Sequence, residues 1–236
     1  MKSLYLIKPA LFLIAALVFT NGALMAQQTK NIAVTNFSEV SVNAGIELII
    51  TQGTTESAKI IAEEGVIDEV KIEKSGNRLN IGWRENHGFS WKNRSAKVYV
   101  YYKKLNGLSA SSGSSLNTSN FLTTDRLAIS VSSGASLNAK IACRDLDLKA
   151  SSGSSTNLSG KAVNMQVEAS SGSTIDALGL ATEYARANTS SGSNIDISVA
   201  KGLETNSSSG SSINYKGNAA LKNNSNSKSS SVSRIN

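Results

Sequence analysis

Hydrophobic and polar residues alternate around a short serine-glycine motif that recurs through the second half of the chain. Ser-Ser-Gly occurs six times, and successive glycines are 21, 19, 19, 20 and 18 residues apart: Gly113, Gly134, Gly153, Gly172, Gly192 and Gly210. The third residue after each glycine is apolar in all repeats but one: Leu116, Leu137, Thr156, Ile175, Ile195 and Ile213. Alternation with a period of two, as in Leu146-Asp-Leu-Lys-Ala150, is typical of β-strands. We therefore predict that the serine-rich half is folded and does not form a flexible linker.

The length of the repeat selects one kind of β structure. A unit of about 19 residues is too short for a strand plus a full helix, and it shows no helical period. Each unit is predicted to form one coil of a parallel β-solenoid, with coils about 4.8 Å apart around a shared apolar interior. The glycine is expected where a bend needs positive φ, and the small serines fit a bend with little interior room.

A second set of positions is predicted to stack on the outside of the coils. The residue after the apolar position is Asn or Asp in every repeat: Asn117, Asn138, Asn157, Asp176, Asp196 and Asn214. In stacked coils, these side chains are expected to form a ladder of hydrogen bonds. Asp176 and Asp196 would lie one coil apart, so we expect both to be at least partly exposed. The segment from Lys228 to Arg234 resembles a further, degenerate repeat with Val232 in the apolar position.

Residues 27–105 alternate less regularly. Strand-like segments occur at 40–42, 46–50, 70–72, 79–83 and 98–102, and a short helix is predicted over 62–70. We expect residues 27–105 to form irregular β coils and residues 106–236 to form the regular solenoid, the two making one continuous domain.

The segment from Arg84 to Arg94 interrupts this pattern and is predicted to be a loop. Aromatic and arginine side chains anchor many interfaces, so this loop supplies the candidate binding residues: His87, Phe89, Trp91 and Arg94. The alternative is that the two aromatic side chains fold back over the edge of the solenoid, since large aromatic residues are mostly buried.

The first 26 residues are typical of a signal peptide. Lys2 and Lys8 flank the start of the segment, residues 10–19 are continuously apolar, and cleavage is predicted between Ala26 and Gln27. Ten apolar residues are too few to span a bilayer of about 30 Å. We therefore expect an exported chain without a transmembrane segment after cleavage, located in the periplasm, associated with the outer membrane or outside the cell.

Composition and charge exclude several classes of function. The net charge of +7 comes from basic residues that are spread along the chain, whereas nucleic-acid binding concentrates them, so no nucleic-acid partner is expected. The single Cys143 cannot form a disulfide within the chain, and one histidine with one cysteine makes no metal site. No catalytic triad or nucleophile elbow is present, so no catalytic residue, metal or cofactor is predicted.

Several segments in their order along the chain resemble a known family. These are residues 37–53, the strand 79–81, the strand 98–101 and the first Ser-Ser-Gly motif at 108–114 with its repeats. Together they resemble the head GIN domain family of autotransporter-adhesin heads, exported proteins of Bacteroidota with no established activity. The resemblance covers about residues 32–220. It implies a single-stranded, right-handed parallel β-helix in or outside the cell envelope, and it carries over no catalytic residue.

These observations favour a non-enzymatic exported solenoid that presents a polar, Ser/Asn-rich surface for adhesion or for interaction with the cell envelope. The partner would be a cell-surface glycan or an envelope protein. The alternative is a carbohydrate-active enzyme or glycan-binding protein on a β-helix scaffold; an enzyme of this kind would need two opposed carboxylates, such as Asp145 with Asp147. A third hypothesis is that the rows of hydroxyls order water or ice.

Overall fold

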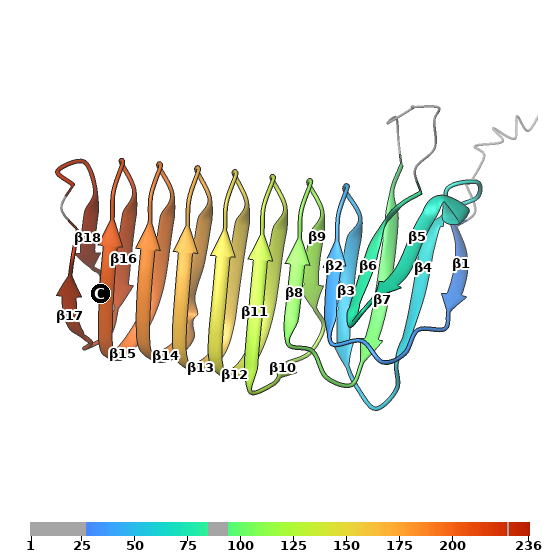
Figure 1. Cartoon of the computed structure of the whole chain (residues 1–236), viewed down its shortest axis with the longest axis horizontal. Coiled ribbons are helices and arrows are strands. Elements are labelled where there is room, and N and C mark those ends of the chain that lie inside the picture. The colour runs from blue at the N-terminus through green and yellow to red at the C-terminus, as the bar shows by residue number, and fades with distance from the viewer. Residues whose placement is uncertain (1–26, 85–93, 226) are drawn as a thin grey trace, which may run out of the picture.

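The computed structural model describes residues 27–84, 94–225 and 227–236, and it is an all-β protein (Figure 1). Its only helical element in these ranges is a single 3-10 turn, η1 (Ile67–Glu69). The strands form one continuous network of pairings, in which coils of a parallel β-solenoid stack side by side. This confirms the predicted fold class.

Each regular coil is one long strand that bends in its middle. The four complete examples are β12 (Ser136–Ala150), β13 (Ser155–Ala169), β14 (Thr174–Thr189) and β15 (Asn194–Ser207). Their pairing is parallel and matches equivalent repeat positions, for example Leu137 with Thr156 and Asn138 with Asn157. The flanking coils are split into shorter strands: β8 (Gly107–Ala110), β9 (Ser115–Thr118), β10 (Leu122–Thr123), β11 (Arg126–Val131), β16 (Ser212–Lys216), β17 (Ala220–Asn223) and β18 (Ser231–Arg234). In β18, Val232 pairs with Ile213, as the degenerate repeat predicts.

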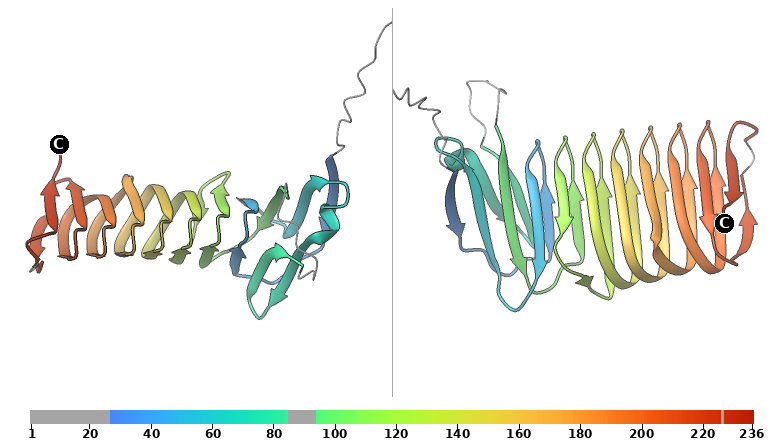
Figure 2. Two further views of the ribbon diagram at one scale, coloured as in Figure 1. Left: turned by 90° about the horizontal axis from the view of Figure 1, so that it is seen from above. Right: turned by 180° about the vertical axis from the view of Figure 1, so that it is seen from behind.

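The N-terminal region contains one coil of the same kind, two strands that pair with it in parallel, β6 (Arg78–Trp83) and β7 (Ala96–Tyr102), and antiparallel strands beyond them. β2 (Glu39–Val42) and β3 (Glu47–Gln52) pair in parallel with β8 and β9 and so continue the solenoid. The other strands here are β1 (Gln27–Ile32), β4 (Ser57–Glu63) and β5 (Val70–Ser75). β4 runs antiparallel to both β1 and β7, and β5 and β6 form an antiparallel hairpin. Figure 2 shows these strands grouped at one end of the stacked coils.

One local prediction in this region is wrong. The helix predicted over 62–70 is reduced to η1, because Ala62 belongs to β4 and Val70 already begins β5. Both residues are buried on the alternating inner side of their strands, so packing of the sheet decides their conformation rather than local helix propensity.

The six Ser-Ser-Gly motifs form identical tight turns along one edge of the solenoid. Each glycine has φ between 68° and 72°, and the serine before it also has positive φ, between 53° and 55°. Two consecutive left-handed residues are the mark of a type I′ turn, which joins strands of native twist. Ala44 and Gly45 adopt the same conformation between β2 and β3, and the Gly45 N–H donates to Ser112 O at 3.0 Å. The sequence pattern therefore missed one turn of the series, because it lacks serine.

The interior is a continuous column of aliphatic side chains that becomes polar next to the turns. The serine or alanine after each turn glycine points inward, and the serines there are at most 2% exposed. Cys143 is also buried, and burial, with a smaller contribution from Asp145, raises the pKa of its thiol to about 11.

At the edge opposite the Ser-Ser-Gly turns, each coil bends without a tight turn. There Gly160 has φ 117°, and a Cβ on it would lie 2.0 Å from Ile141 O.

Candidate binding face

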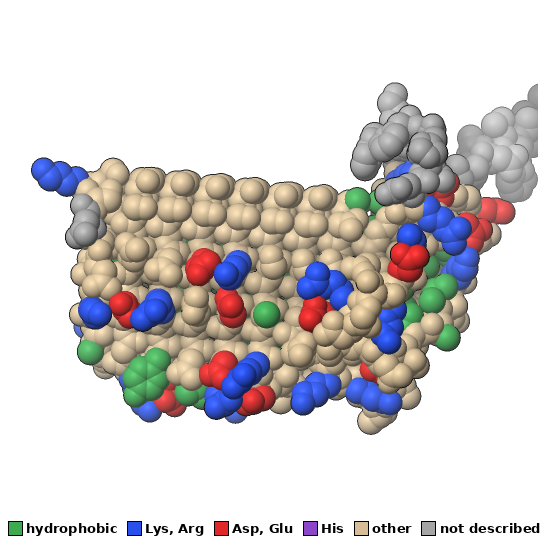
Figure 3. Space-filling model, in the orientation of Figure 1, with side chains coloured by type: hydrophobic (Ala, Val, Ile, Leu, Met, Phe, Trp, Pro, Cys, Tyr) green, Lys and Arg blue, Asp and Glu red, His purple; other side chains and the backbone are tan. Residues whose placement is uncertain are grey.

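The face turned toward the viewer in Figure 3 carries charged side chains of both signs, and we call it the front face. It consists of the outward-facing residues of β11, of the second halves of β12 to β15, and of β17. The parallel register stacks these residues into columns across the coils. One column contains Arg126, Asp145, Asn164, Tyr184 and Gly202.

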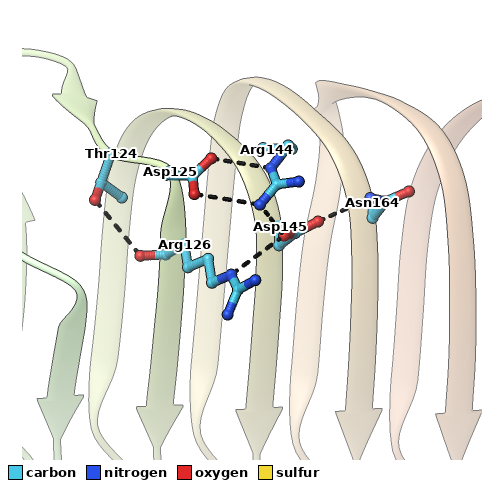
Figure 4. A network of polar contacts seen from close by, with 6 residues as sticks. All are labelled: Thr124, Asp125, Arg126, Arg144, Asp145 and Asn164. Atoms are coloured by element: carbon cyan, nitrogen blue, oxygen red, sulfur yellow. Dashed lines mark hydrogen bonds and ion pairs between the residues drawn. The ribbon is translucent and has the colours of Figure 1, made fainter.

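Two arginines and two aspartates form a network at one end of this face (Figure 4). Arg144 donates to both carboxylate oxygens of Asp125, from Nε at 2.9 Å and from Nη2 at 3.2 Å. Arg144 also lies 3.3 Å from Asp145, and Arg126 lies 3.6 Å from it. The Asn164 amide donates to Asp145 at 2.8 Å. The Arg144 hydrogen bond holds the pKa of Asp125 below its usual range, so this carboxylate is ionised at neutral pH.

A second network lies three coils farther along the same face. Arg186 donates to Glu204 at 2.8 and 3.2 Å, and Lys222 approaches the other carboxylate oxygen at 3.4 Å. Asn224 adds a hydrogen bond to the same oxygen at 2.8 Å. Arg186 first, and Lys222 second, hold the pKa of Glu204 below its usual range.

A groove of about 910 Å³ runs along the front face and includes residues of both networks. Part of its lining has small side chains or none, at Ala128, Gly202 and Ala220. Tyr184 is half exposed, and its Cδ1 lies 3.1 Å from the position that a Cβ on Gly202 would occupy, so the ring covers this glycine. Lys201 lies 5.7 Å from the centre of the same ring. The groove thus presents an aromatic surface between fixed charges.

Asp147 differs from the other charged residues of the groove. It is exposed between Ala128 and Gln166, its neighbours on the two adjoining coils. Within the described parts of the chain it has no ion pair and its side chain makes no hydrogen bond. Its carboxylate oxygens are therefore available to a hydroxyl or other donor.

The family model described as "Putative auto-transporter adhesin, head GIN domain" matches residues 36–219 of the chain. The chain belongs to this family. No curated protein sequence matches it.

Solved structures of similar fold include proteins from Bacteroides fragilis and Parabacteroides distasonis. A "putative adhesin" from Bacteroides fragilis is 18% identical, with a TM-score of 0.80, over 89% of this chain and 97% of that one. A "putative adhesin" from Parabacteroides distasonis is 17% identical, with a TM-score of 0.71, over the same shares of the two chains. A "putative lipid binding protein" from Parabacteroides distasonis is also 17% identical, with a TM-score of 0.69 over those shares. At this level of identity the likeness shows the shared fold.

Of the four residues predicted for binding in this head GIN domain protein, only Arg94 is among the described residues. His87, Phe89 and Trp91 lie outside the described residues, as does Ala26 at the predicted cleavage site, whereas Gln27 begins β1. Arg94 pairs with Glu69 at 3.2 Å, and its guanidinium lies 5.9 Å from the centre of the Trp83 ring. It does not line the front-face groove.

The Asn/Asp positions stack in register on the face opposite the groove, but the hydrogen bonds between them are incomplete. Asn138 donates to Asn117 at 3.2 Å, and Asn214 donates to Asp196 at 2.7 Å. Asp176 instead accepts from the backbone N–H of Leu178 at 3.1 Å. Asp176 and Asp196 pair in register on adjacent coils, and both are partly exposed. Asn157 pairs in register with Asn138 and Asp176, and its side chain is exposed.

The sequence named two residues that line the groove, Asp145 and Asp147, as a candidate carboxylate pair, but it did not identify the others, although one signal pointed to Tyr184 and Gly202. Tyr184 and Gly202 are 18 residues apart, which is one coil, and an aromatic residue one coil from a glycine can lie flat over it.

Within residues 27–84, 94–225 and 227–236, no helix is long and apolar enough to cross a membrane. In those same ranges, no three His, Cys, Asp or Glu side chains are grouped to hold a metal ion.

Proposed function

We propose that this protein is an exported, non-enzymatic adhesin head whose front-face groove binds a neutral, hydroxyl-rich glycan. The observation that carries the proposal is the placement of Tyr184, half exposed and lying over Gly202 within the groove. An exposed aromatic ring offers an apolar surface on which the flat side of a sugar ring can pack. Polar groups that converge around such a surface fix orientation and give specificity.

The charges of the groove favour a neutral ligand over a charged polymer. Arg126 pairs with Asp145, and Glu204 pairs with Arg186 and Lys222. Glu39, at one end, pairs with Arg78 at 2.7 Å. A polyanion or polycation would have to displace these partners, whereas a neutral sugar can share their remaining lone pairs and N–H groups. Asp147, Asn164 and Gln166 add acceptors and donors on adjacent coils.

Export is the second part of the proposal. It is supported by the signal-peptide pattern of residues 1–26 and by membership in a family of adhesin-like heads. The periplasm, the outer membrane and the cell exterior are all consistent with this pattern, and each would bring the groove close to envelope or surface glycans.

The test is a glycan array probed with the chain from Gln27 onward and with the variant Tyr184→Ala. We expect retention on neutral glycans by the parent, and roughly tenfold weaker binding by the variant from loss of the ring contact. Tyr101→Ala is the matched control, because Tyr101 is 37% exposed but does not line the groove. Equal binding by all three proteins would contradict the groove as the binding site. Cleavage of a glycan by the parent protein would contradict the non-enzymatic role.

A further inference from the structure

The two long edges of the solenoid differ in charge. The edge formed by the six Ser-Ser-Gly turns has no charged residue in those turns, which are uniformly tan along the upper margin of Figure 3. The opposite edge, where the coils bend, we call the bend edge; it includes residues 119–125, 140–144, 159–163, 178–183, 198–202 and 216–219. Five exposed lysines on or beside it have no ion pair in the part of the chain that the structure describes: Lys103, Lys104, Lys140, Lys161 and Lys216.

The register places two of these lysines in one column along the rod and Lys140 in the column two residues away. Lys161 and Lys216 occupy the same column, separated by Ala181 and Ser198. Three coil spacings of about 4.8 Å put the two lysine backbones about 14 Å apart. At the other end, the Gln52 amide donates to both Lys103 O and Thr123 O at 3.2 Å, which holds Lys103 next to the bend of the following coil.

Exposed apolar side chains lie among the lysines. Phe121 is 52% exposed, and its Cε1 lies 3.0 Å from the position of a Cβ on Gly160. Because Leu122 pairs with Ile141, Phe121 lies beside Lys140 on the next coil, and its ring reaches the coil that carries Lys161. The aromatic ring is thus flanked by two lysines that lack carboxylate partners among the described residues.

A second exposed apolar residue on this edge lies within a β-bulge. Asn157 pairs with Asp176 but Ser159 pairs with Gly179, so β14 has one residue more than β13 between these pairs. Leu178, within the bulge, is 36% exposed, and Val163 on the neighbouring bend is 38% exposed. Leu178 faces outward in the regular alternation after the buried Ala177, and the bulge leaves both Leu178 and Gly179 exposed before Leu180 returns to the interior.

We propose that the bend edge docks on a lipid surface with anionic headgroups. The lysines would lie near the phosphates, and Phe121 and Leu178 would enter the boundary between headgroups and acyl chains. Lipid is favoured over an anionic polysaccharide because Leu178 and Val163 are exposed as well as Phe121, and their aliphatic side chains offer no flat ring to a sugar but are stabilised at a membrane interface. The solenoid would lie along the surface, leaving the front-face groove and the turn edge accessible.

The experiment measures binding of the chain from Gln27 onward to lipid vesicles. This form contains every described strand and lacks the apolar segment 10–19, which would itself enter vesicles. We expect binding to phosphatidylcholine vesicles that contain phosphatidylglycerol, and little binding to pure phosphatidylcholine. Each lysine near an anionic surface contributes a factor of about five, so Lys140→Gln/Lys161→Gln is expected to bind roughly 25-fold more weakly at low salt. Phe121→Ser should weaken binding as well, with its thermal unfolding measured in parallel.

The matched control is Lys228→Gln, which removes one exposed lysine from the opposite edge in the last coil. It is expected to bind as the parent does, whereas Lys161→Gln alone should bind about fivefold more weakly. Absence of parent binding to anionic vesicles would overturn the proposal, as would equal losses in Lys161→Gln and Lys228→Gln. Binding to a soluble anionic polysaccharide but not to vesicles would overturn the lipid assignment. Because the lysine variants alter no packed side chain, these outcomes do not depend on the stability of Phe121→Ser, and none of them involves the glycan groove.

Discussion

The buried hydroxyl of Ser154 donates a hydrogen bond to the backbone oxygen of Val131, one coil earlier, at 3.0 Å. The Ser154 hydroxyl oxygen also accepts a hydrogen bond from the Ser151 N–H at 3.1 Å, which closes the tight turn from inside. Ser173 makes the equivalent pair of bonds with Ala150 and Ser170. In these two repeats the serine after the turn glycine links neighbouring coils. It adds side-chain hydrogen bonds to backbone groups that also bond to each other, since the Ser151 N–H donates to Val131 O at 3.0 Å.

Substitution Ser154→Ala is expected to lower the free energy of unfolding by about 1 kcal/mol, because it removes the side-chain hydrogen bonds to a buried carbonyl and a turn N–H, which keep only the bond between them. Urea unfolding followed by circular dichroism measures the change. Ser155→Ala is the control, since Ser155 is exposed and its side chain makes no hydrogen bond among the described residues. The chain already has alanine at the equivalent position of one repeat, Ala135, so Ala135→Ser should raise stability. Equal effects of the Ser154 and Ser155 substitutions would contradict this role.

Two glycines with positive φ are expected to respond differently to the same change. A Cβ on Gly153 meets no atom within 4 Å, so Gly153→Ala costs only the left-handed conformation, about 1 kcal/mol. A Cβ on Gly160 would lie 2.0 Å from Ile141 O at φ 117°, so the backbone must move and the loss should reach about 3 kcal/mol or more. Thermal unfolding of the two variants tests this order, and a Gly153 variant as unstable as the Gly160 variant would contradict it.

The solenoid could be predicted from the sequence because the pattern that determines each coil lies within about 20 consecutive residues and recurs in every repeat. A period-two alternation on both sides of Gly113 and its equivalents determines which side chains face inward, and the repeat length leaves room for no helix. The antiparallel pairing of β4 with β1 and β7 could not be predicted in this way, since these strands alternate like the others and their partners are distant in sequence. The groove was missed for a related reason. Its charges are ordinary surface residues in the sequence, and only the register brings Arg126 beside Asp145 and Tyr184 over Gly202.

Thr156 is a polar residue at a repeat position that is apolar in the other coils, and we expect it to lower the stability of the fold. It occupies the interior position held by leucine, isoleucine or valine in the other coils, and its buried Oγ1 has no hydrogen-bond partner. Thr156→Val replaces this hydroxyl with a methyl group of similar size, and it is expected to raise the free energy of unfolding by about 1 kcal/mol.

The matched substitution is Thr189→Val, also at a buried position. The Thr189 hydroxyl lies 2.6 Å from the Ser193 hydroxyl, so its removal leaves a buried group without this partner and should lower stability. The two threonine variants are therefore expected to shift the urea midpoint in opposite directions. A loss of stability in Thr156→Val would show that its hydroxyl has a stabilising partner in solution.

The front-face networks predict which carboxyl groups titrate unusually. Because the Arg144 hydrogen bond holds the pKa of Asp125 below its usual range, Arg144→Gln should move that pKa up toward the ordinary aspartate value. Carboxyl carbon shifts measured by NMR across an acid titration would report the change. Glu204 is the control, since its pKa is lowered by Arg186 and Lys222 and should not respond.

The direction of the Asp125 pKa shift determines how the free energy of unfolding depends on pH. A carboxyl group with a lower pKa in the folded chain stabilises the fold above its unfolded pKa, and this contribution disappears as the pH falls through the folded pKa. The Arg144 variant should therefore differ from the parent near neutral pH and converge with it in strong acid. Both groups are exposed, so the difference should be small and should shrink as salt is added. An unchanged Asp125 titration in Arg144→Gln would mean that this pair, although close in the structure, is not formed in solution.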